Sequence, residues 1–419
     1  MKKIAILLFL GALAWTAGAQ KDTRAEVLAE IEKAGGNYYM YPTDQPVPTA
    51  APKGYQPYYI THFGRHGARY ALGNNVYTEQ MDIWSKAHDK GWLTPAGERI
   101  YEALRELYPQ VKGREGQLTF KGQEQHRLIA RQMYRNYPAV FRGKTRAMAA
   151  STDVHRVIVS MYSCLDQLKE LDRDFSYTAD YGEPYETTIL PEALLASTQY
   201  TDSVNTQYKR LRARVLAADI PGRWFTVPAD SLTDSVYGLI SDLHTVVNDL
   251  DNLDIPAPEG LLGIFTPEER YGIWLASNFR HYARFGRSPY MKQQKYRTMI
   301  PLMEELIAQA ESDPQEGIAL RLRFGHDTCL MPLLSLLGVN GMDKMVPNPD
   351  EVAAYWRNFD VPMACNLQLV FFKSKKHPDI LVQVLLNGFE ATLPLEMAAP
   401  GSFYRWEDVK GLVTAPERG

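Results

Sequence analysis

The sequence predicts an α/β protein with a mostly parallel central sheet flanked by helices and a mainly helical domain inserted into it. Apolar, strand-like runs alternate with helical patterns before residue 166 and again after residue 290, as in parallel sheets covered by helices. The segment between them has mixed, mostly helical periodicity that Pro and Gly interrupt. The composition, with 45% hydrophobic and 23% charged residues, is typical of a globular protein. We therefore expect one α/β domain from residues 20–165 and 291–419, and a helical insertion, or cap, at 166–290.

The first 19 residues predict a secretory signal peptide. Lys2 and Lys3 precede an apolar run at 4–15, and small residues follow up to Ala19. This run is shorter than the ~20 residues that a membrane span needs, and no later segment of the sequence is apolar enough to cross a membrane. We expect cleavage after Ala19 and a periplasmic or secreted protein.

Charge and cysteine content exclude several classes of protein. The formal net charge is −3, and loss of the two lysines in the signal peptide makes it more negative, whereas nucleic-acid-binding proteins usually carry a basic excess. Cys164, Cys329 and Cys365 allow at most one disulfide bridge, and their spacing does not predict a zinc site. We expect no nucleic-acid partner and no disulfide framework, and the oligomeric state stays open.

The regular elements are expected to begin with a strand at 58–62. The preceding segment, 37–57, is rich in Pro and Tyr and is typical of an extended lead-in that runs over a surface. Thr94 and Thr119 each precede a helical pattern and can cap the helix that follows. A second strand is predicted at 145–151. It leads into a helix whose apolar residues share one face, namely Val154, Ile158, Met161 and Leu165.

The same alternation returns in the last third of the chain. Thr266 and Glu269 form a capping-box pattern that predicts a helix running on to residue 286. The remaining expected elements are a helix at 303–310, a strand at 318–324, a helix at 328–337 and two strands at 366–372 and 380–386 that flank the turn "KSKKHPD".

Charged residues gather where three of the predicted strands end. Arg65, His66 and Arg69 follow the first strand, the segment 151–156 with Arg156 follows the second, and His326 and Asp327 follow the strand at 318–324. Ligands of open α/β sheets bind outside the carboxyl ends of the strands, so these groups should converge if the strands are parallel and adjacent. Arginine forks bind phosphoryl oxygens through paired, charge-assisted hydrogen bonds. The sequence therefore predicts a pocket for a phosphate dianion.

Each of these residues also has a simpler interpretation. A single arginine at a strand end is commonly a solvated surface charge, and a histidine between two glycines can be a hydrogen-bonded turn residue. Six such groups at three strand ends favour the shared phosphate pocket instead.

Four motifs in the chain resemble those of the histidine acid phosphatases. "GRHGARY" is similar to the Arg-His-Gly-x-Arg-x-Pro signature of that family, and "GHD" to its downstream His-Asp pair. Between them, "LTFKGQEQ" resembles its Leu-Thr-x-x-Gly-x-x-Gln helix and "STDVHR" its Ser-Thr-Asp-x-x-Arg segment. The resemblance covers about 55–165 and 318–390, in the family's order.

The resemblance implies a role for each matched residue. His66 would be the nucleophile, with Arg65, Arg69 and Arg156 binding the phosphoryl oxygens, His326 a further phosphate ligand and Asp327 the proton donor to the leaving alcohol. The implied enzyme is a phosphomonoester hydrolase that works through a phosphohistidine, with a phosphorylated small molecule as substrate and no metal or organic cofactor. The chemistry is consistent, because a covalent intermediate divides one difficult displacement into two easier ones.

Two departures keep the subgroup open. Ala71 stands where the family signature has proline, although no reacting atom is lost. The secreted, Tyr-rich start and the Arg-His-Gly-x-Arg-Tyr form are similar to the multiple inositol polyphosphate phosphatases, which would make inositol polyphosphates such as phytate the substrate. Those enzymes usually carry His-Ala-Glu, whereas this chain has the His-Asp form of general acid phosphatases and bacterial phytases.

Asp327 raises a question about pH. Four or five neighbouring cationic groups should lower the pKa of this carboxyl, yet it must donate a proton. We expect activity that favours acidic or mildly acidic pH.

Several features remain outside this assignment. Arg280, Arg284 and Arg287 follow one side of a predicted helix and would either receive further phosphates of the substrate or form a solvated, ion-paired surface. His62 has no assigned role, and a metal pair with His66 is not predicted because the stretch has strand and turn character. A phosphomutase, or a phosphate-ester binding protein without catalysis, are the alternative functions.

Overall fold

The computed structural model describes residues 22–72, 76–196 and 198–414 of the chain. The predicted signal peptide at 1–19 lies outside the described residues. Within the described part of the chain, no helix combines the length and the hydrophobicity of a membrane span.

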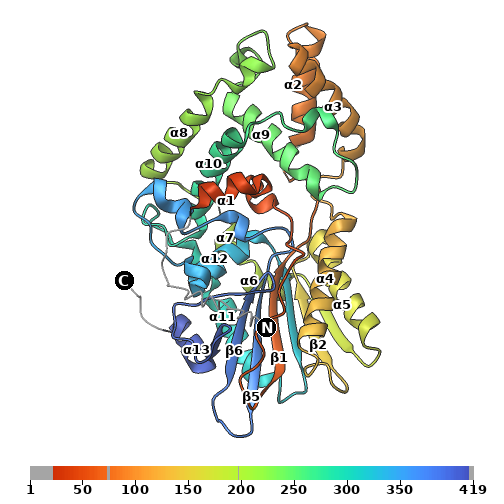
Figure 1. Cartoon of the computed structure of the whole chain (residues 1–419), viewed down its shortest axis with the longest axis vertical. Helices are drawn as coiled ribbons and strands as arrows, with labels where there is room; N and C mark the ends of the chain where they lie inside the picture. The colour runs from red at the N-terminus through yellow and green to blue at the C-terminus, as the bar shows by residue number, and fades with distance from the viewer. Residues whose placement is uncertain (1–21, 73–75, 197, 415–419) are drawn as a thin grey trace, which may run out of the picture.

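A sheet lies at the centre of the molecule (Figure 1), and it has eight strands among the described residues. Its strands run in the order β3-β2-β4-β1-β5-β6-β7. The remaining strand, β8, pairs with the first three residues of β6, Leu381, Val382 and Gln383. The strands are β1 (Tyr55–Arg65), β2 (Arg146–Ser151), β3 (Ser176–Tyr181), β4 (Leu320–Gly325), β5 (Asn366–Ser374), β6 (Leu381–Leu386), β7 (Phe389–Glu390) and β8 (Phe403–Arg405).

The predicted α/β class, a central sheet flanked by helices, is confirmed, but the sheet is mixed rather than mostly parallel. Strands β1, β2, β3 and β4 are parallel to one another, whereas β5 is antiparallel to β1, and β6 is antiparallel to β5, β7 and β8. The reason lies in the connections, because a short turn such as the one between β5 and β6 can join only antiparallel strands. Strand β3 was not predicted.

Helices surround the sheet and extend beyond it. The α-helices are α1 (Thr23–Ala29), α2 (Val76–Asp89), α3 (Pro95–Val111), α4 (Phe120–Asn136), α5 (His155–Leu171), α6 (Glu183–Ile189), α7 (Glu192–Leu195), α8 (Asp202–Leu216), α9 (Val236–Asp249), α10 (Pro267–Phe285), α11 (Ile300–Ser312), α12 (Asp327–Leu337) and α13 (Trp406–Thr414). Short 3₁₀ helices join them: η1 (Ile31–Tyr38), η2 (Ile220–Arg223), η3 (Ala229–Ser231), η4 (Leu250–Asn252), η5 (Glu259–Leu261), η6 (Lys295–Met299), η7 (Val339–Gly341), η8 (Pro349–Ala354) and η9 (Asn358–Asp360).

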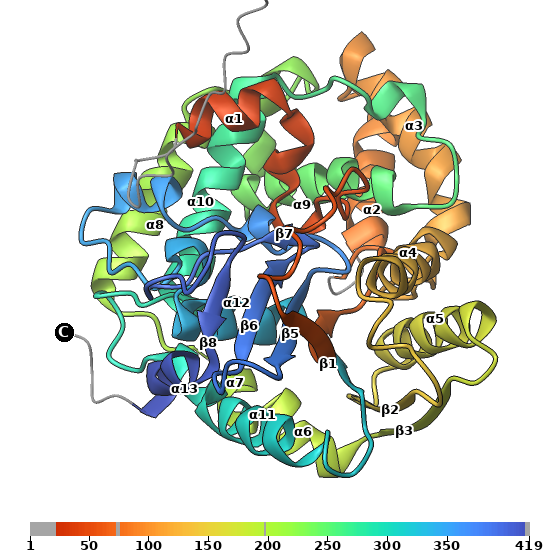
Figure 2. The same ribbon diagram turned by 60° about the horizontal axis from the view of Figure 1, so that its bottom comes forward.

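Each face of the sheet is covered by its own set of helices (Figure 2). Side chains alternate between the faces along β1, so that Ile60 packs in the core under α4 and α5 while Tyr59 and Phe63 pack in the core under α11 and α12. Helices α2, α3, α8, α9 and α10 gather at one end of the molecule, beyond the sheet (Figure 1). These five helices form a helical layer that lies beyond one end of the strands.

The division of the chain at residues 166 and 290 stays a prediction. Most of the predicted insertion is helical, but β3 within it joins the central sheet beside β2. Helices α2 and α3, which precede the predicted insertion, lie with α8, α9 and α10 in the helical layer (Figure 1).

The first part of the chain that the structure describes, from residue 22, is more regular than the sequence suggested. The predicted extended lead-in begins at 37, but α1 and η1 precede it, and residues 37 and 38 belong to η1. The predicted caps are confirmed: the hydroxyl of Thr94 accepts from Gly97 N, that of Thr119 accepts from Gly122 N, and Thr266 and Glu269 complete a capping box.

The start of α4 is packed directly against the loop that follows β1. The amide and the hydroxyl of Thr119 both donate to Ala68 O, at 2.9 Å each, and Ala68 N donates to Gln125 Oε1 at 2.8 Å. A Cβ atom at Gly67 would lie 2.2 Å from Gly122 O, and one at Gly122 would lie 2.2 Å from Ala68 O. Only glycines permit this approach, which explains the Leu-Thr-x-x-Gly-x-x-Gln pattern as a clamp on the loop.

Gly122→Ala is expected to lower the free energy of unfolding by about 1–3 kcal/mol or more, because the added methyl group overlaps backbone that other hydrogen bonds hold in place. Urea-induced unfolding measures this effect. Gly411→Ala is the matched control: Gly411 lies in α13 with no atom within 4 Å of an added Cβ, so the helix should gain up to about 1 kcal/mol. Equal stability of the Gly122→Ala variant and the wild type would contradict the close packing.

Candidate active site

The charged residues predicted at three strand ends do meet at one edge of the sheet. Strands β2, β4 and β1 are adjacent and parallel, with Ser151 opposite Phe324 and Arg65 opposite Gly325. Their carboxyl ends therefore point the same way. The loop after β1, the start of α5 and the start of α12 leave the sheet beside one another, which brings the six predicted site residues together.

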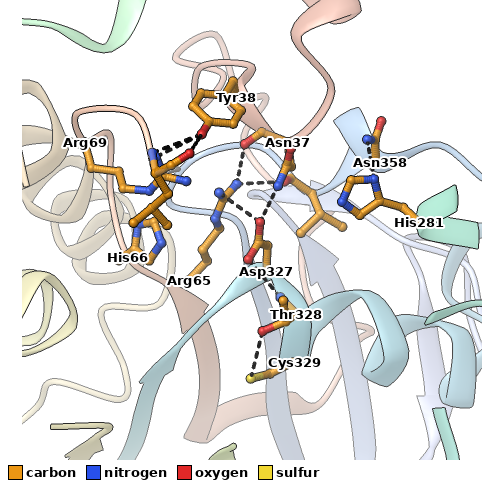
Figure 3. A network of polar contacts seen from close by, with 12 residues as sticks. Asn37, Tyr38, Arg65, His66, Arg69, His281, Asp327, Thr328, Cys329 and Asn358 are labelled. Carbon is orange, nitrogen blue, oxygen red and sulfur yellow. Dashed lines mark hydrogen bonds and ion pairs between the residues drawn. The ribbon is translucent and has the colours of Figure 1, made fainter. Parts of the chain in front are cut away.

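Arg65 and Asp327 form the central ion pair of the site (Figure 3). Arg65 Nη2 lies 3.0 Å from Asp327 Oδ2, and the arginine side chain is fully buried. Arg65 Nη1 donates to the backbone oxygens of Asn37 at 2.5 Å and Val361 at 3.1 Å. The Asn37 side chain donates to Asp327, and Asp327 Oδ1 accepts from Thr328 N at 2.9 Å.

These contacts determine the charge of the carboxyl. Burial alone would raise the pKa of Asp327, but the Arg65 guanidinium, the Asn37 hydrogen bond and the charge of Arg69 hold it well below its usual range. Asp327 is therefore an ionised carboxylate in the unliganded protein.

His66 is held by backbone contacts on both sides. The backbone N–H of His66 donates to Gly325 O at 3.1 Å, and its backbone carbonyl accepts from Ala364 N at 2.9 Å. Its ring Nδ1 lies 2.9 Å from Gly67 O. Because a carbonyl oxygen can only accept, Nδ1 carries the proton and Nε2 keeps its lone pair. Burial, followed by the charges of Arg65 and Arg156, holds the pKa of His66 well below its ordinary value, so the ring is neutral.

Arg69 and Arg156 complete the cationic lining. Arg69 is buried, its Nη1 donates to Tyr70 O at 2.9 Å and Tyr38 Oη at 3.3 Å, and its guanidinium carbon lies 4.8 Å from the centre of the Tyr38 ring. Burial and the charge of Arg69 lower the pKa of Arg156 to about 10, which leaves it a cation at neutral pH. These two groups repel each other in the absence of an anion.

His326 closes the site on the side of β2. Its Nε2 lies 3.2 Å from Thr152 Oγ1, and its ring centre lies 5.8 Å from that of His66. Burial and then the charge of Arg156 lower the pKa of His326 to about 4. With both histidines neutral, three arginines face a single carboxylate, so the pocket has an excess of positive charge that suits a dianion.

The described residues contain no group of three or more His, Cys, Asp or Glu side chains arranged to hold a metal ion. All three cysteines are buried and free.

A cavity of about 570 Å³ extends from this site into the helical layer. Arg69 and Asp327 line one end of it, and Arg280, His281 and Arg284 of α10 line the wall contributed by the helical layer. Three tyrosines complete that part of the wall, Tyr200, Tyr208 and Tyr237.

The three arginines singled out around α10 are in different surroundings. The Arg280 guanidinium carbon lies 4.9 Å from the ring centres of Tyr200 and Tyr208. Arg284 Nη2 donates weakly to Leu194 O at 3.4 Å, and its Nε is buried without a hydrogen-bond partner in the described part of the chain. Arg287 is not among the residues that line the cavity, and its Nη1 lies 3.8 Å from Asp343 Oδ2.

Two residues in contact with the central ion pair and with Arg69 were not predicted. Asn37 and Tyr38 end η1, in the segment interpreted from the sequence as an extended surface lead-in. The sequence did contain a signal for a turn, because two glycines precede "NYY" and glycine readily adopts a positive φ. In the structure Gly36 has a φ of 60°, at a kink within η1. Nothing local in the sequence, however, indicates that this turn lies over β1.

His62 is close to the site in sequence, but it belongs to the core under α4. Its ring centre lies 5.1 Å from that of Phe324, and the His126 ring of α4 lies 5.6 Å from the same phenyl ring. Both histidines are almost completely buried. Burial lowers the pKa of His62 to about 4 and, together with the nearby His62, that of His126 to about 3.

The fold and the site together define an α/β protein with a buried, arginine-rich pocket at the carboxyl edge of its sheet. A family model described as "Histidine phosphatase superfamily (branch 2)" matches residues 63–387, and the chain belongs to this superfamily. The resemblance drawn from four short motifs is confirmed, and the protein is a phosphoric monoester hydrolase of the histidine type. None of the curated protein sequences compared with the chain matches it.

Solved structures share the fold at low sequence identity. The multiple inositol polyphosphate phosphatase of Bifidobacterium longum in complex with phosphate aligns with a TM-score of 0.73 and 18% identity, over 91% of this chain and 98% of that chain. The same enzyme in complex with inositol hexasulfate aligns with a TM-score of 0.70 and 17% identity, over the same shares of the two chains. The phytase of D. castellii aligns with a TM-score of 0.70 and 13% identity, over 92% and 85%.

His126→Gln is expected to weaken the loss of stability at acidic pH. Between pH 6.5 and about 3 the unfolded chain protonates its histidines while the buried His126 stays neutral, so the free energy of unfolding falls as the pH falls. The variant should lose about 2 kcal/mol less than the wild type between pH 7 and pH 5. Urea-induced unfolding at the two pH values measures the difference.

His377→Gln provides the control, because His377 is exposed in the turn between β5 and β6. Its pH dependence should match that of the wild type. An equally unchanged pH dependence in the His126→Gln variant would show that His126 is not buried as a neutral ring.

Proposed function

We propose that the protein hydrolyses phosphate monoesters through a phosphohistidine formed on His66. The observation that carries the proposal is the buried, neutral His66 ring among three arginines and one carboxylate, at the carboxyl ends of adjacent parallel strands. In the first step Nε2 forms a bond to phosphorus while the bond to the ester oxygen breaks, and the leaving oxygen takes a proton from Asp327. In the second step the oxygen of a water molecule displaces Nε2, and Asp327 takes the proton that the water loses.

The low pKa of His66 suits this role. A protonated ring has no lone pair at Nε2, and burial, followed by the charges of the surrounding arginines, keeps the ring neutral even at acidic pH. Arg65, Arg69 and Arg156 would bind the oxygens of the transferred group, where phosphoryl-transfer enzymes stabilise charge. His326, beside Thr152, would donate to one further oxygen.

The ion pair with Arg65 explains how Asp327 can serve as an acid. In the unliganded protein the arginine charge keeps the carboxyl ionised. A bound phosphate dianion neutralises much of that charge and places negative charge beside the carboxylate, and both effects raise the pKa of Asp327. Substrate binding thus favours the protonated form, and acidic pH favours it further.

The cavity supports a substrate with more than one phosphate. Neither Arg280 nor Arg284 forms an ion pair with a carboxylate in the part of the chain that the structure describes, although both face the cavity. Lys295 Nζ shares the acceptor Leu194 O with Arg284, at 3.0 Å, so a further positive charge lies next to Arg284, although Lys295 does not itself line the cavity. An inositol polyphosphate such as phytate fits such surroundings. The predicted signal peptide supports a periplasmic or secreted enzyme.

His66→Ala is expected to abolish turnover of both p-nitrophenyl phosphate and inositol hexakisphosphate, because the proposed phosphoryl intermediate forms on its Nε2. Asp327→Asn should lower kcat by about 10²- to 10⁴-fold on inositol hexakisphosphate and much less on p-nitrophenyl phosphate, whose leaving group needs little protonation. Phosphate release measured from pH 4 to pH 8 tests both, and the wild-type rate should fall above neutral pH. Full activity of His66→Ala would overturn the assignment of His66 as the nucleophile. If the wild type bound phosphate but released none from either substrate, the protein would be a binding protein.

Arg284→Gln is expected to raise KM for inositol hexakisphosphate by about tenfold or more and to leave KM for p-nitrophenyl phosphate unchanged, since only the larger substrate reaches α10. Arg287→Gln is the matched control, because this side chain does not line the cavity. Steady-state kinetics with the two substrates measure both variants. A similar rise in KM for both substrates, or for both variants, would contradict a second phosphate position at Arg284.

A further inference from the structure

The carboxylate of Asp249 is buried behind the loop that carries Arg69. Asp249 is the last residue of α9 and has no exposed surface. Its Oδ2 accepts hydrogen bonds from Ala71 N, at 2.8 Å, and from the hydroxyl of Tyr77. Its Oδ1 lies 3.4 Å from Asn252 Nδ2. Burial raises its pKa to about 6, and the Tyr77 hydrogen bond and the charge of Arg69 oppose that rise.

The donor from the loop exists only because residue 71 is not proline. Ala71 N–H is shared between Asp249 Oδ2 and Tyr77 Oη, the latter at 2.9 Å. Proline has no backbone N–H and would hold this part of the chain through its rigid ring instead. The chain thus replaces a covalent restraint on the loop with a buried hydrogen-bond network.

That network acts on Arg69 through one peptide unit. The amide of Ala71 and the carbonyl of Tyr70 belong to the same planar group, so orienting one orients the other. Arg69 Nη1 donates to that Tyr70 carbonyl at 2.9 Å. Asp249 therefore holds the N–H end of the peptide while the Arg69 guanidinium is held at the C=O end.

A second connection reaches the other neighbour of Arg69. Asn252 Nδ2, besides its contact with Asp249, donates to Tyr38 O at 3.0 Å. The Tyr38 ring stacks against the Arg69 guanidinium, and its hydroxyl accepts from Arg69 Nη1. Both groups that orient Arg69 are thus tied to Asp249, and the end of α9 is coupled to the active site.

We propose that Asp249 is a positioning residue for the phosphate site, which orients Arg69 through the peptide between Tyr70 and Ala71. The inference rests on the proposed function in one respect, namely that Arg69 binds the phosphoryl oxygens. Asp249 does not line the cavity, so it acts only through these intermediaries.

The test compares Asp249→Asn with the wild type by two readouts. Calorimetric titration with inorganic phosphate should show a dissociation constant about tenfold to a hundredfold higher in the variant, the effect of a charge-assisted hydrogen bond. The value of kcat/KM for p-nitrophenyl phosphate should fall by a similar factor. Asp242→Asn, the same change two turns earlier in α9 and away from the loop, is the matched control and should alter neither quantity. Equal phosphate affinity of Asp249→Asn and the wild type would overturn the proposal.

A double-mutant cycle distinguishes positioning through Ala71 from a general structural role. Ala71→Pro removes the N–H that Asp249 accepts, so adding Asp249→Asn to it should raise the phosphate dissociation constant by no more than about threefold. The same large factor in both backgrounds would show that Asp249 does not act through this amide, and would overturn the relay.

Two further measurements keep the outcome decisive. If Asp249→Asn does not fold, Tyr77→Phe removes one of the donors to the carboxylate and keeps its charge; a raised dissociation constant in that variant supports the proposal, and an unchanged one overturns it. The His66→Ala variant distinguishes failure of the proposed function from failure of this proposal. Full turnover in that variant would overturn His66 as the nucleophile, whereas the phosphate affinity of Asp249→Asn alone decides the role of Asp249.

Discussion

Three arginines share one buried pocket with the carboxylate of Asp327. The ion pair between Arg65 and Asp327 offsets part of the repulsion between the positive charges of the arginines. Like charges repel strongly where water is excluded, so buried arginines need acceptors or an opposite charge beside them. Arg65 is held by two carbonyl oxygens and Asp327, and Arg69 by Tyr70 and Tyr38. The remaining excess of positive charge is what a phosphate dianion would neutralise.

That electrostatic requirement explains why the site is built from distant parts of the chain. The sheet supplies the strand ends, and the loop after β1 carries His66, but most of the acceptors that restrain the arginines come from η1 and from the loop before β5. The α4 clamp on Ala68 and the Asp249 network on Ala71 hold the same loop from two sides. The helical layer is therefore part of the site and not only a cover for it.

Much of the site was predictable because its motifs are local. Arg65, His66 and Arg69 stand within five residues, and the rule that parallel strands share a carboxyl edge brings Arg156, His326 and Asp327 to them. The helix caps at Thr94, Thr119 and Thr266 were predictable for the same reason, because a cap depends on its own first turn. By contrast, the exposed strand β3 has no apolar alternation to indicate it, with most of its side chains facing solvent.

The sequence by itself determined the superfamily, the α/β class and the charged residues that meet at the edge of the sheet, since these depend on local patterns and on the order of motifs. Only the tertiary structure decided that Asn37 contacts the ion pair and Tyr38 contacts Arg69, that Arg280 and Arg284 face the cavity while Arg287 does not, and that Asp249 holds the Ala71 amide. These relations join residues up to 290 positions apart. They arise from how the helical layer packs on the sheet, and the side-chain contacts of that packing leave no periodic trace in the sequence.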